Sequence, residues 1–207
     1  MRRTLFSWTF ALLLGIIAAL LAVPGWNKIA DTDEDESVNI NGTGFIEDPR
    51  SLPRLENPVI IIDKSQKYLY IYDNQLPVAR FPVSIGAKKG DKYCEGDKRT
   101  PVGRFYVCLK NPNSKYVLSL GLSYPNIEDA ERGLMEGLVS RKDYERIVAA
   151  IRNRGIPPWD TALGGEIMIH GKRDGGRPTL GCIALEDEAI RAVYREIAVG
   201  TPVIIKQ

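Results

Sequence analysis

The amino-acid sequence predicts a mainly β domain, a curled, mixed and sandwich-like sheet with a few helices, preceded by an N-terminal transmembrane or signal segment. About eight short runs rich in β-branched and aromatic residues support the strand prediction. So many strands do not stay flat in one half-exposed sheet. Two segments with helical spacing supply the helices. The length of 207 residues, of which 44% are hydrophobic and 26% charged, is that of one globular domain.

The chain begins with a long uncharged segment. After Arg2 and Arg3, residues 5–23 carry no charge over 19 positions, close to the roughly 20 residues that span a bilayer. We predict an uncleaved anchor over residues 1–24, with the N-terminus in the cytoplasm and the rest outside by the positive-inside rule. A signal peptide cleaved after about Ala22 is the alternative. Residues 25–56 are polar and acidic, and we expect them to be a linker.

Strand candidates follow one another along residues 57–207. The first three runs are separated by short polar turns, so we expect them to be consecutive antiparallel strands. The predicted strands cover Pro58–Asp63, Lys67–Tyr72, Leu76–Ile85, Gly103–Leu109, Tyr116–Leu120, Glu166–His170, Cys182–Leu185 and Pro202–Ile205.

Two stretches have helical spacing. Within residues 126–155, Ser140 precedes Asp143 by three residues, as in a capping box, and apolar residues then share one face. We expect this helical insertion to be a packing element, because its apolar face needs a core; a lid that selects the acceptor is the alternative. A second helix is predicted over residues 187–198, ending at Gly200.

The charge is unevenly distributed along the chain. Residues 1–49 hold three basic and seven acidic residues, so the remainder has 25 basic against 19 acidic residues, a net charge of about +6. This excess suits an anionic polymer or envelope surface, but the basic residues do not form the runs that mark nucleic-acid binding. We expect no nucleic-acid partner. With one histidine and three separated cysteines, we expect no metal site.

Residues 166–185 concentrate the chemistry. An apolar strand ends at His170, the only histidine, and a Gly-rich loop returns through Gly181 to Cys182 and another apolar run. This spacing predicts neighbouring strands that bring an imidazole beside a thiol. In Cys–His catalysis the base takes the thiol proton, and the ion pair keeps the thiolate populated near neutral pH. The backbone N–H groups of Gly181 and Cys182 would form an oxyanion hole.

A structural role is the alternative for both residues. In that case His170 caps a strand end and Cys182 is a small buried hydrophobe. The cysteine count favours catalysis, because outside the cytoplasm a Cys94–Cys108 disulfide would leave Cys182 as the odd thiol. We carry the Cys94–Cys108 disulfide as a prediction, with unpaired cysteines as the alternative.

Three separated motifs resemble the L,D-transpeptidase catalytic domain of bacterial cell walls. The opening strands of that domain are similar to VIIIDKSQKYLYIYDNQLPVARFPVSIG, its Thr-Pro-x-Gly segment to GDKRTPVGRFYV, and its active-site signature to IMIHG followed by TLGCIAL. The resemblance covers roughly residues 57–206. It implies a curled, sandwich-like β domain of the L,D-transpeptidase type over residues 57–207.

The resemblance also implies a peptidoglycan-modifying cysteine acyltransferase. Cys182 would attack the carbonyl at the L-centre of the third stem-peptide residue and form a thioester, with His170 as general base and later acid. The Gly171 carbonyl would orient the imidazole, with Asp174 as an alternative partner, and Thr179 matches the Ser/Thr position of the signature. No cofactor is needed. The implied location is the cell envelope, at the periplasmic or extracytoplasmic face of the inner membrane.

Two positions depart from the family signature. Ala184 stands where an arginine usually follows the nucleophile by two residues, and Leu180 replaces a histidine often found two residues before it. Because acceptor choice depends on such groups, attack at the stem carbonyl is better supported than cross-linking. An L,D-carboxypeptidase or amide hydrolase of the same fold is therefore an alternative. A peptidoglycan-binding module without chemistry is a further one.

Overall fold

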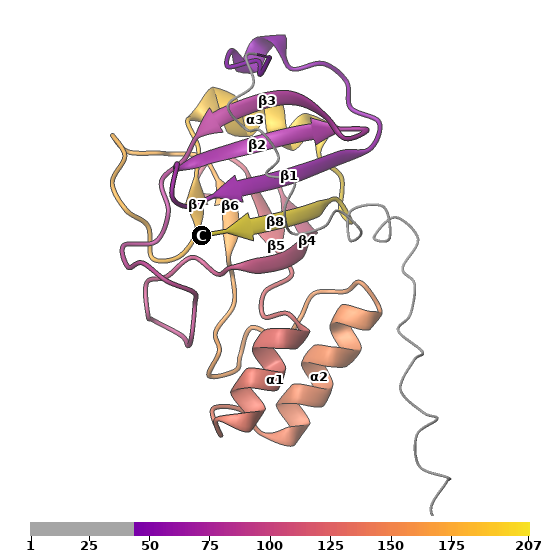
Figure 1. Cartoon of the computed structure of the whole chain (residues 1–207), viewed down its shortest axis with the longest axis vertical. Coiled ribbons are helices and arrows are strands. Elements are labelled where there is room, and N and C mark those ends of the chain that lie inside the picture. Colours follow the sequence, from indigo (N-terminus) through magenta and orange to yellow (C-terminus); the bar gives the residue numbers. More distant parts are fainter. Residues whose placement is uncertain (1–43) are drawn as a thin grey trace, which may run out of the picture. The chain divides into compact units, whose positions relative to one another are not determined.

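The computed structural model describes residues 44–207, in which eight strands form one curled sheet (Figure 1). The predicted membrane or signal segment over residues 1–24 lies outside the described residues, as does the linker as far as residue 43. Across residues 44–207, no helix combines the length and the apolar character needed to cross a membrane.

The sheet has the strand order β3-β2-β1-β8-β4-β5-β6-β7. The first three strands pair antiparallel, as predicted from their short turns, whereas β8 pairs parallel with β1 and β6 pairs parallel with β7. The strands are β1 Pro58–Asp63, β2 Tyr68–Asp73, β3 Leu76–Pro82, β4 Gly103–Asn111, β5 Ser119–Leu122, β6 Met168–His170, β7 Ile183–Ala184 and β8 Pro202–Lys206. The prediction of a mainly β, mixed sheet is confirmed.

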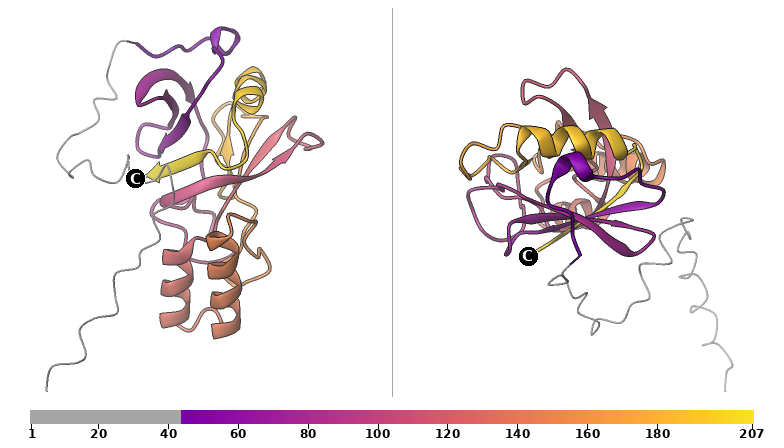
Figure 2. Two further views of the ribbon diagram at one scale, coloured as in Figure 1. Left: turned by 90° about the vertical axis from the view of Figure 1, so that its right-hand side faces the viewer. Right: turned by 90° about the horizontal axis from the view of Figure 1, so that it is seen from above.

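One continuous curled sheet stands where the sequence predicts a sandwich-like layer. The last strand, β8, pairs with β1 on one side and with β4 on the other, which joins the two halves of the sheet. The helix α3 (Asp187–Glu196) runs beside the curled sheet (Figure 2) and contributes Ile190 and Val193 to the main core, together with Ile60 and Leu120. All four side chains are fully buried. The core therefore holds the curl closed around α3.

The end of α3 differs from the prediction. The helix stops at Glu196, and Ile197 is already extended. Gly200 has a φ of +94° and lies in the turn that leads into β8, so it does not cap the helix. Burial of Ile197 in the main core pulls the chain out of the helix before the glycine is reached.

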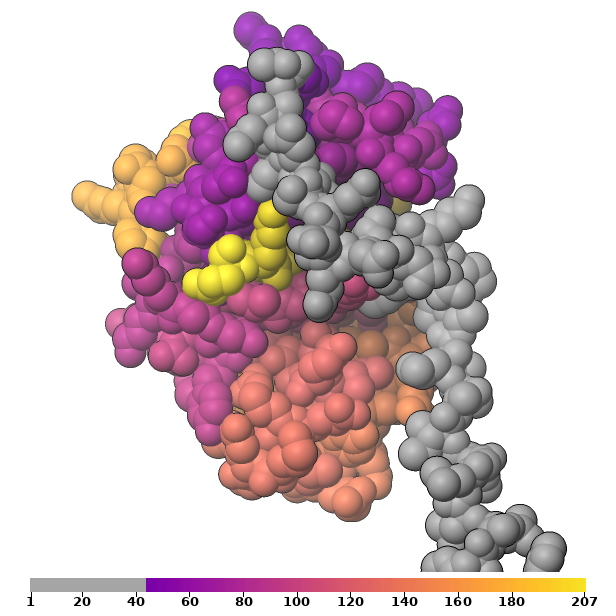
Figure 3. Space-filling model, viewed as in Figure 1, coloured from indigo at the N-terminus to yellow at the C-terminus, as the bar shows by residue number. Residues whose placement is uncertain are grey.

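The segment 126–155 folds as two helices, α1 (Ile127–Met135) and α2 (Arg141–Arg152), at one end of the sheet (Figures 1 and 3). Their apolar faces enclose a small second core of buried side chains, consisting of Ala130, Val139, Ile147 and Leu163. Leu163 comes from the segment that leads into β6, so the helical pair is packed onto the chain that carries His170.

The start of α2 gives a test of this packing. The Ser140 hydroxyl accepts a hydrogen bond from the Asp143 N–H at 3.1 Å. We expect Ser140→Ala to lower the free energy of unfolding by about 1 kcal/mol, because this N–H loses its partner. Ser140→Thr keeps the acceptor and should stay close to the wild type. Urea unfolding of the three proteins measures the difference, and equal stability of Ser140→Ala and Ser140→Thr would contradict the role of the cap.

Candidate active site

The parallel pair of β6 and β7 brings the two predicted catalytic side chains to adjacent strands. Ile169 lies opposite Ile183, and His170 lies opposite Ala184. Continued by one residue, this register places Cys182 beside Met168. Residues of equal parity share a face of the sheet, so the thiol and the imidazole lie on the same side, with Cα atoms roughly 8 Å apart along the diagonal.

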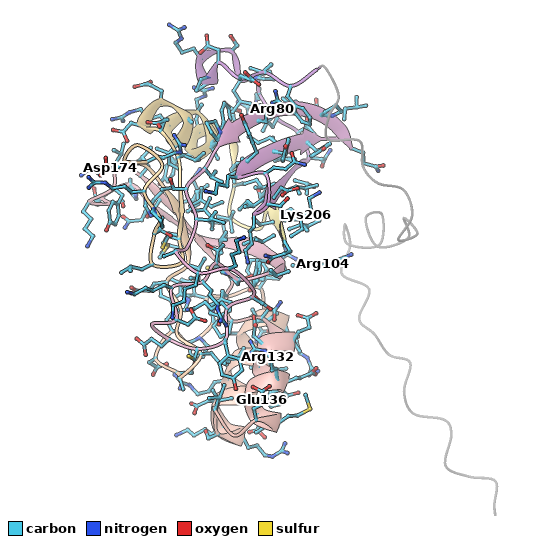
Figure 4. The ribbon with its side chains drawn as sticks, turned by 60° about the vertical axis from the view of Figure 1, so that its left-hand side comes forward. Arg80, Arg104, Arg132, Glu136, Asp174 and Lys206 are labelled. Atoms are coloured by element: carbon cyan, nitrogen blue, oxygen red, sulfur yellow. The ribbon has the colours of Figure 1, made fainter. Side chains whose placement is uncertain are left out.

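The Gly171 carbonyl selects one tautomer of the neutral His170 ring. Its side chain is buried, and Nδ1 lies 2.6 Å from the Gly171 carbonyl oxygen. A carbonyl oxygen only accepts, so Nδ1 carries the proton and the neutral ring leaves Nε2 free to take one. Asp174, the alternative partner in the sequence, instead pairs with Arg177 at 3.1 Å on the exposed loop that follows His170 (Figure 4).

An aromatic ring that sequence reasoning missed covers the imidazole. Tyr116 stacks on His170 with ring centroids 4.4 Å apart and an interplanar angle of 27°. The Tyr116 carbonyl accepts a hydrogen bond from the Gly171 N–H at 3.0 Å. A Cβ atom on Gly171 would stand 2.7 Å from that carbonyl oxygen. Gly171 therefore has to be glycine if Tyr116 is to reach the histidine.

The thiol of Cys182 is partly buried and donates a hydrogen bond to the Glu166 carbonyl at 3.5 Å. Burial raises the pKa of the Cys182 thiol above its ordinary value, although the Met168 N–H and the charge of Lys92 act in the opposite direction. Burial likewise lowers the pKa of His170. The free site therefore favours a neutral thiol beside a neutral imidazole.

The hydroxyl of Thr179 holds the backbone around Cys182 through two hydrogen bonds. The Gly181 N–H donates to Thr179 Oγ1 at 3.0 Å, and the same hydroxyl donates to the Cys182 carbonyl at 2.6 Å. Of the two predicted oxyanion donors, Gly181 is thus already engaged. The Cys182 N–H has no acceptor among residues 44–207 and is the donor that stays available.

A second threonine, which the sequence places in the Thr-Pro-x-Gly segment, holds the other side of Gly181. The Thr100 hydroxyl donates to the Gly181 carbonyl at 2.9 Å and accepts from the Gly86 N–H at 2.9 Å. Thr100 is buried. The Thr-Pro-x-Gly motif was the sequence signal that could have identified it as a site residue. Thr100 thus belongs to the site.

The predicted Cys94–Cys108 disulfide is wrong in this structure, because the three cysteines in residues 44–207 are all free thiols. Cys108 is buried in β4 against Gly121, and burial raises the pKa of its thiol to about 11. Cys94 lies in the loop of residues 91–97, where its N–H donates to Asp97. The two cysteines belong to different packing environments, which counting them along the sequence could not show.

The family follows from comparison with known domains. The model of the YkuD L,D-transpeptidase catalytic domain matches residues 57–205. The chain belongs to this YkuD family. A comparison with curated protein sequences finds no significant match.

Several solved structures are similar to this chain. The helical cell shape determining protein Pgp2 from Campylobacter jejuni superposes with a TM-score of 0.50 at 23% identity, over 80% of this chain and 52% of that chain. Bd1075 from Bdellovibrio bacteriovorus has a TM-score of 0.49 at 20% identity, over 73% of this chain and 48% of that chain. An L,D-transpeptidase from Mycobacterium smegmatis has a TM-score of 0.44 at 13% identity, over 73% of this chain and 59% of that chain. This chain spans about half the length of Pgp2 and Bd1075, and the likeness to Pgp2 concerns the fold.

The burial of the thiol predicts how its reactivity depends on pH. Because the pKa of Cys182 is raised, the thiolate fraction should grow up to about tenfold per pH unit between pH 7 and 9. We expect the iodoacetamide alkylation rate of Cys182, followed by peptide mass spectrometry, to rise through this range. A plateau already reached near pH 7 would show that the free protein holds a thiolate–imidazolium pair instead.

Thr179 offers a second test of the site. Thr179→Val leaves the Gly181 N–H and the Cys182 carbonyl without their partner, so we expect a loss of about 1 kcal/mol in the free energy of unfolding and slower alkylation of Cys182. Thr179→Ser keeps the hydroxyl and serves as the control. Denaturant unfolding and alkylation rates measure both effects. A valine variant as stable and as reactive as the serine variant would show that the Thr179 hydroxyl does not hold the backbone around Cys182.

Proposed function

We propose that this YkuD-family protein is a peptidoglycan-modifying cysteine acyltransferase, an L,D-transpeptidase that acts on stem peptides through a thioester. The observation that carries the proposal is that His170 ends β6 and Cys182 directly precedes the neighbouring parallel strand β7, with Nδ1 of His170 bonded to the Gly171 carbonyl. Membership of the family, through the match over residues 57–205, supplies the substrate class.

The arrangement supports one sequence of steps. As the substrate binds, the Cys182 proton passes to Nε2 of His170 while the sulfur attacks the carbonyl at the L-centre of the third stem residue. The Cys182 N–H supports the oxyanion. The terminal D-amino acid then leaves with the proton that His170 returns, which completes the thioester. An acceptor amine or water attacks the thioester, with His170 again as base, and Cys182 is regenerated.

Hydrolysis, as in an L,D-carboxypeptidase, is the second candidate, and two residues favour it. Ala184 is buried and offers no cation to an acceptor, and Leu180, whose exposed fraction is 75%, presents an apolar side chain next to the nucleophile. Because neither position offers a polar side chain to an amine acceptor, water is the simplest acceptor. A binding module without chemistry would need neither the positioned thiol nor the fixed imidazole.

The proposed location follows from the substrate. Stem peptides lie in the cell envelope, so the domain would act outside the cytoplasm, tethered by the apolar segment of residues 5–23. Pgp2 is described as a determinant of helical cell shape. Trimming or joining stem peptides is the route by which this protein would influence the shape of its own cell.

Incubation of purified tetrapeptide muropeptides with the protein, with a D-amino acid added, tests the proposal by mass spectrometry. We expect products that depend on Cys182, and Cys182→Ala should abolish them because it removes the nucleophile. Dimers or D-amino acid exchange identify a transpeptidase. Shortened stems without exchange identify the carboxypeptidase.

Thiol labelling separates the enzyme from the binding module. His170→Ala removes the base and should slow alkylation of Cys182 at pH 7, with His170→Gln as the control for ring volume. Equal labelling of all three proteins, together with unchanged muropeptides, would contradict the enzyme and favour a module that only binds the wall.

A further inference from the structure

The turn between β4 and β5 holds a strained residue directly after Tyr116. Val117 has a φ of +73°, a conformation in which a β-branched residue is an outlier. The Leu118 N–H donates to the Tyr116 carbonyl, two residues back, at 2.9 Å. This φ and this hydrogen bond are those of the rare γ-turn with positive φ, which is strained. Such strain persists only where the surrounding structure holds it, and it gathers at functional sites.

This turn is held against the chain that follows His170. The Tyr116 carbonyl also accepts a hydrogen bond from the Gly171 N–H at 3.0 Å, and the Lys172 ammonium donates to the Lys115 carbonyl. Gly171 supplies the carbonyl oxygen that lies 2.6 Å from Nδ1 of His170. The same glycine therefore fixes both the imidazole and the turn that carries Tyr116.

Core packing does not account for the position of the Tyr116 ring. Its exposed fraction is 39%, and it belongs to neither of the two hydrophobic cores in residues 44–207. The ring instead contacts an imidazole and an ammonium. It stacks on His170 with ring centroids 4.4 Å apart, and Nζ of Lys115 lies 5.2 Å from its centroid. The strained turn thus places the ring on the histidine rather than in a core.

A ring in this position affects the imidazole in two ways. The hydrogen bond at Nδ1 leaves the imidazole free to tilt about it, and a stacked ring at an interplanar angle of 27° restricts that tilt. The π-face of a tyrosine also attracts a cation within about 6 Å of its centroid. Burial lowers the pKa of His170, so the imidazolium is the form that needs stabilisation.

We propose that Tyr116 is a positioning residue of the active site, whose ring fixes the plane of the His170 imidazole and stabilises the imidazolium formed during attack. This inference rests on the proposed function, in which His170 is the general base. The proton leaves Sγ of Cys182 for Nε2, while Nδ1 keeps its own proton on the Gly171 carbonyl. Tyr116 keeps its phenolic proton and acts only through the face of its ring.

The charged groups near His170 leave this role to Tyr116. Besides Tyr116, the titratable and charged side chains on the segments packed around the imidazole are Lys115, Lys172, Arg173, Cys182, Glu186 and Asp187. Both carboxylates are already engaged. Glu186 pairs with Arg173 at 2.8 Å. Asp187 accepts from the Lys172 N–H at 2.7 Å. Within residues 44–207, the imidazolium is left with the Gly171 carbonyl and the Tyr116 ring.

The titration of His170, followed by NMR in the full chain without substrate, tests the proposal. His170 is the only histidine, so its Cε1–H signal reports this imidazole alone when the protein carries no histidine tag. We expect Tyr116→Leu to weaken proton binding by His170 roughly threefold to tenfold, because the imidazolium loses the ring face. Tyr116→Phe keeps the ring face and should titrate like the wild type.

Tyr93 supplies a matched control. Its exposed fraction of 40% is close to that of Tyr116, and the guanidinium carbon of Arg132 lies 5.2 Å from its ring centroid. Tyr93 does not stack on His170, so Tyr93→Leu should leave the titration unchanged. Urea unfolding checks that the variants are folded, which we expect because Tyr116 lies outside both cores.

Four results would overturn the proposal. Tyr116→Leu leaves the titration unchanged, Tyr116→Phe behaves like Tyr116→Leu, or Tyr93→Leu has the same effect as Tyr116→Leu. The fourth is stronger proton binding in Tyr116→Leu, which is the result for a ring that only shields the imidazole from water. Muropeptide turnover is read separately, so a failure of the proposed function stays distinguishable.

Discussion

The parallel pairing of β6 with β7 positions the two reactive side chains of the site. These strands hold only three and two residues, too few for ladder hydrogen bonds to keep them in register unaided. Burial supplies the rest, because Ile169 and Ile183 face each other in the pairing and are both fully buried in the main core. A slip of β7 by one residue would turn Ile183 toward the site and Cys182 into the core, so the hydrophobic core protects the catalytic geometry.

Hydroxyl groups do in the loop what ladder hydrogen bonds do in the strands. The N–H of Gly181 is held by Thr179, and its carbonyl is held by Thr100, which comes from a distant part of the chain. Gly181 has a φ of +139° and sits directly against the Arg99 carbonyl, so only glycine fits. With both polar groups of Gly181 engaged, the peptide before Cys182 is rigid before any substrate arrives, as a preorganised site requires.

Local sequence patterns predicted the strands well, because β-branched runs such as Pro58–Asp63 carry their own signal. The adjacency of the two strands that carry His170 and Cys182 was also predictable, since a short loop joins them. Contacts between distant segments were not. Thr100 and Gly181 are 81 residues apart, and no periodicity reports that they touch. Burial could not be read from spacing either, and burial is what raises the pKa of Cys182 and lowers the pKa of His170.

The small side chain of Ala184 fits its buried position between two neighbouring segments. Ala184 lies between two neighbours: it pairs with His170 on one side and exchanges both backbone hydrogen bonds with Ser84 on the other. Both Ala184 and Ser84 are buried, and Ser84 Oγ has no hydrogen-bond partner among the described residues. A guanidinium here would have to be buried, and without a paired carboxylate that carries a large desolvation cost.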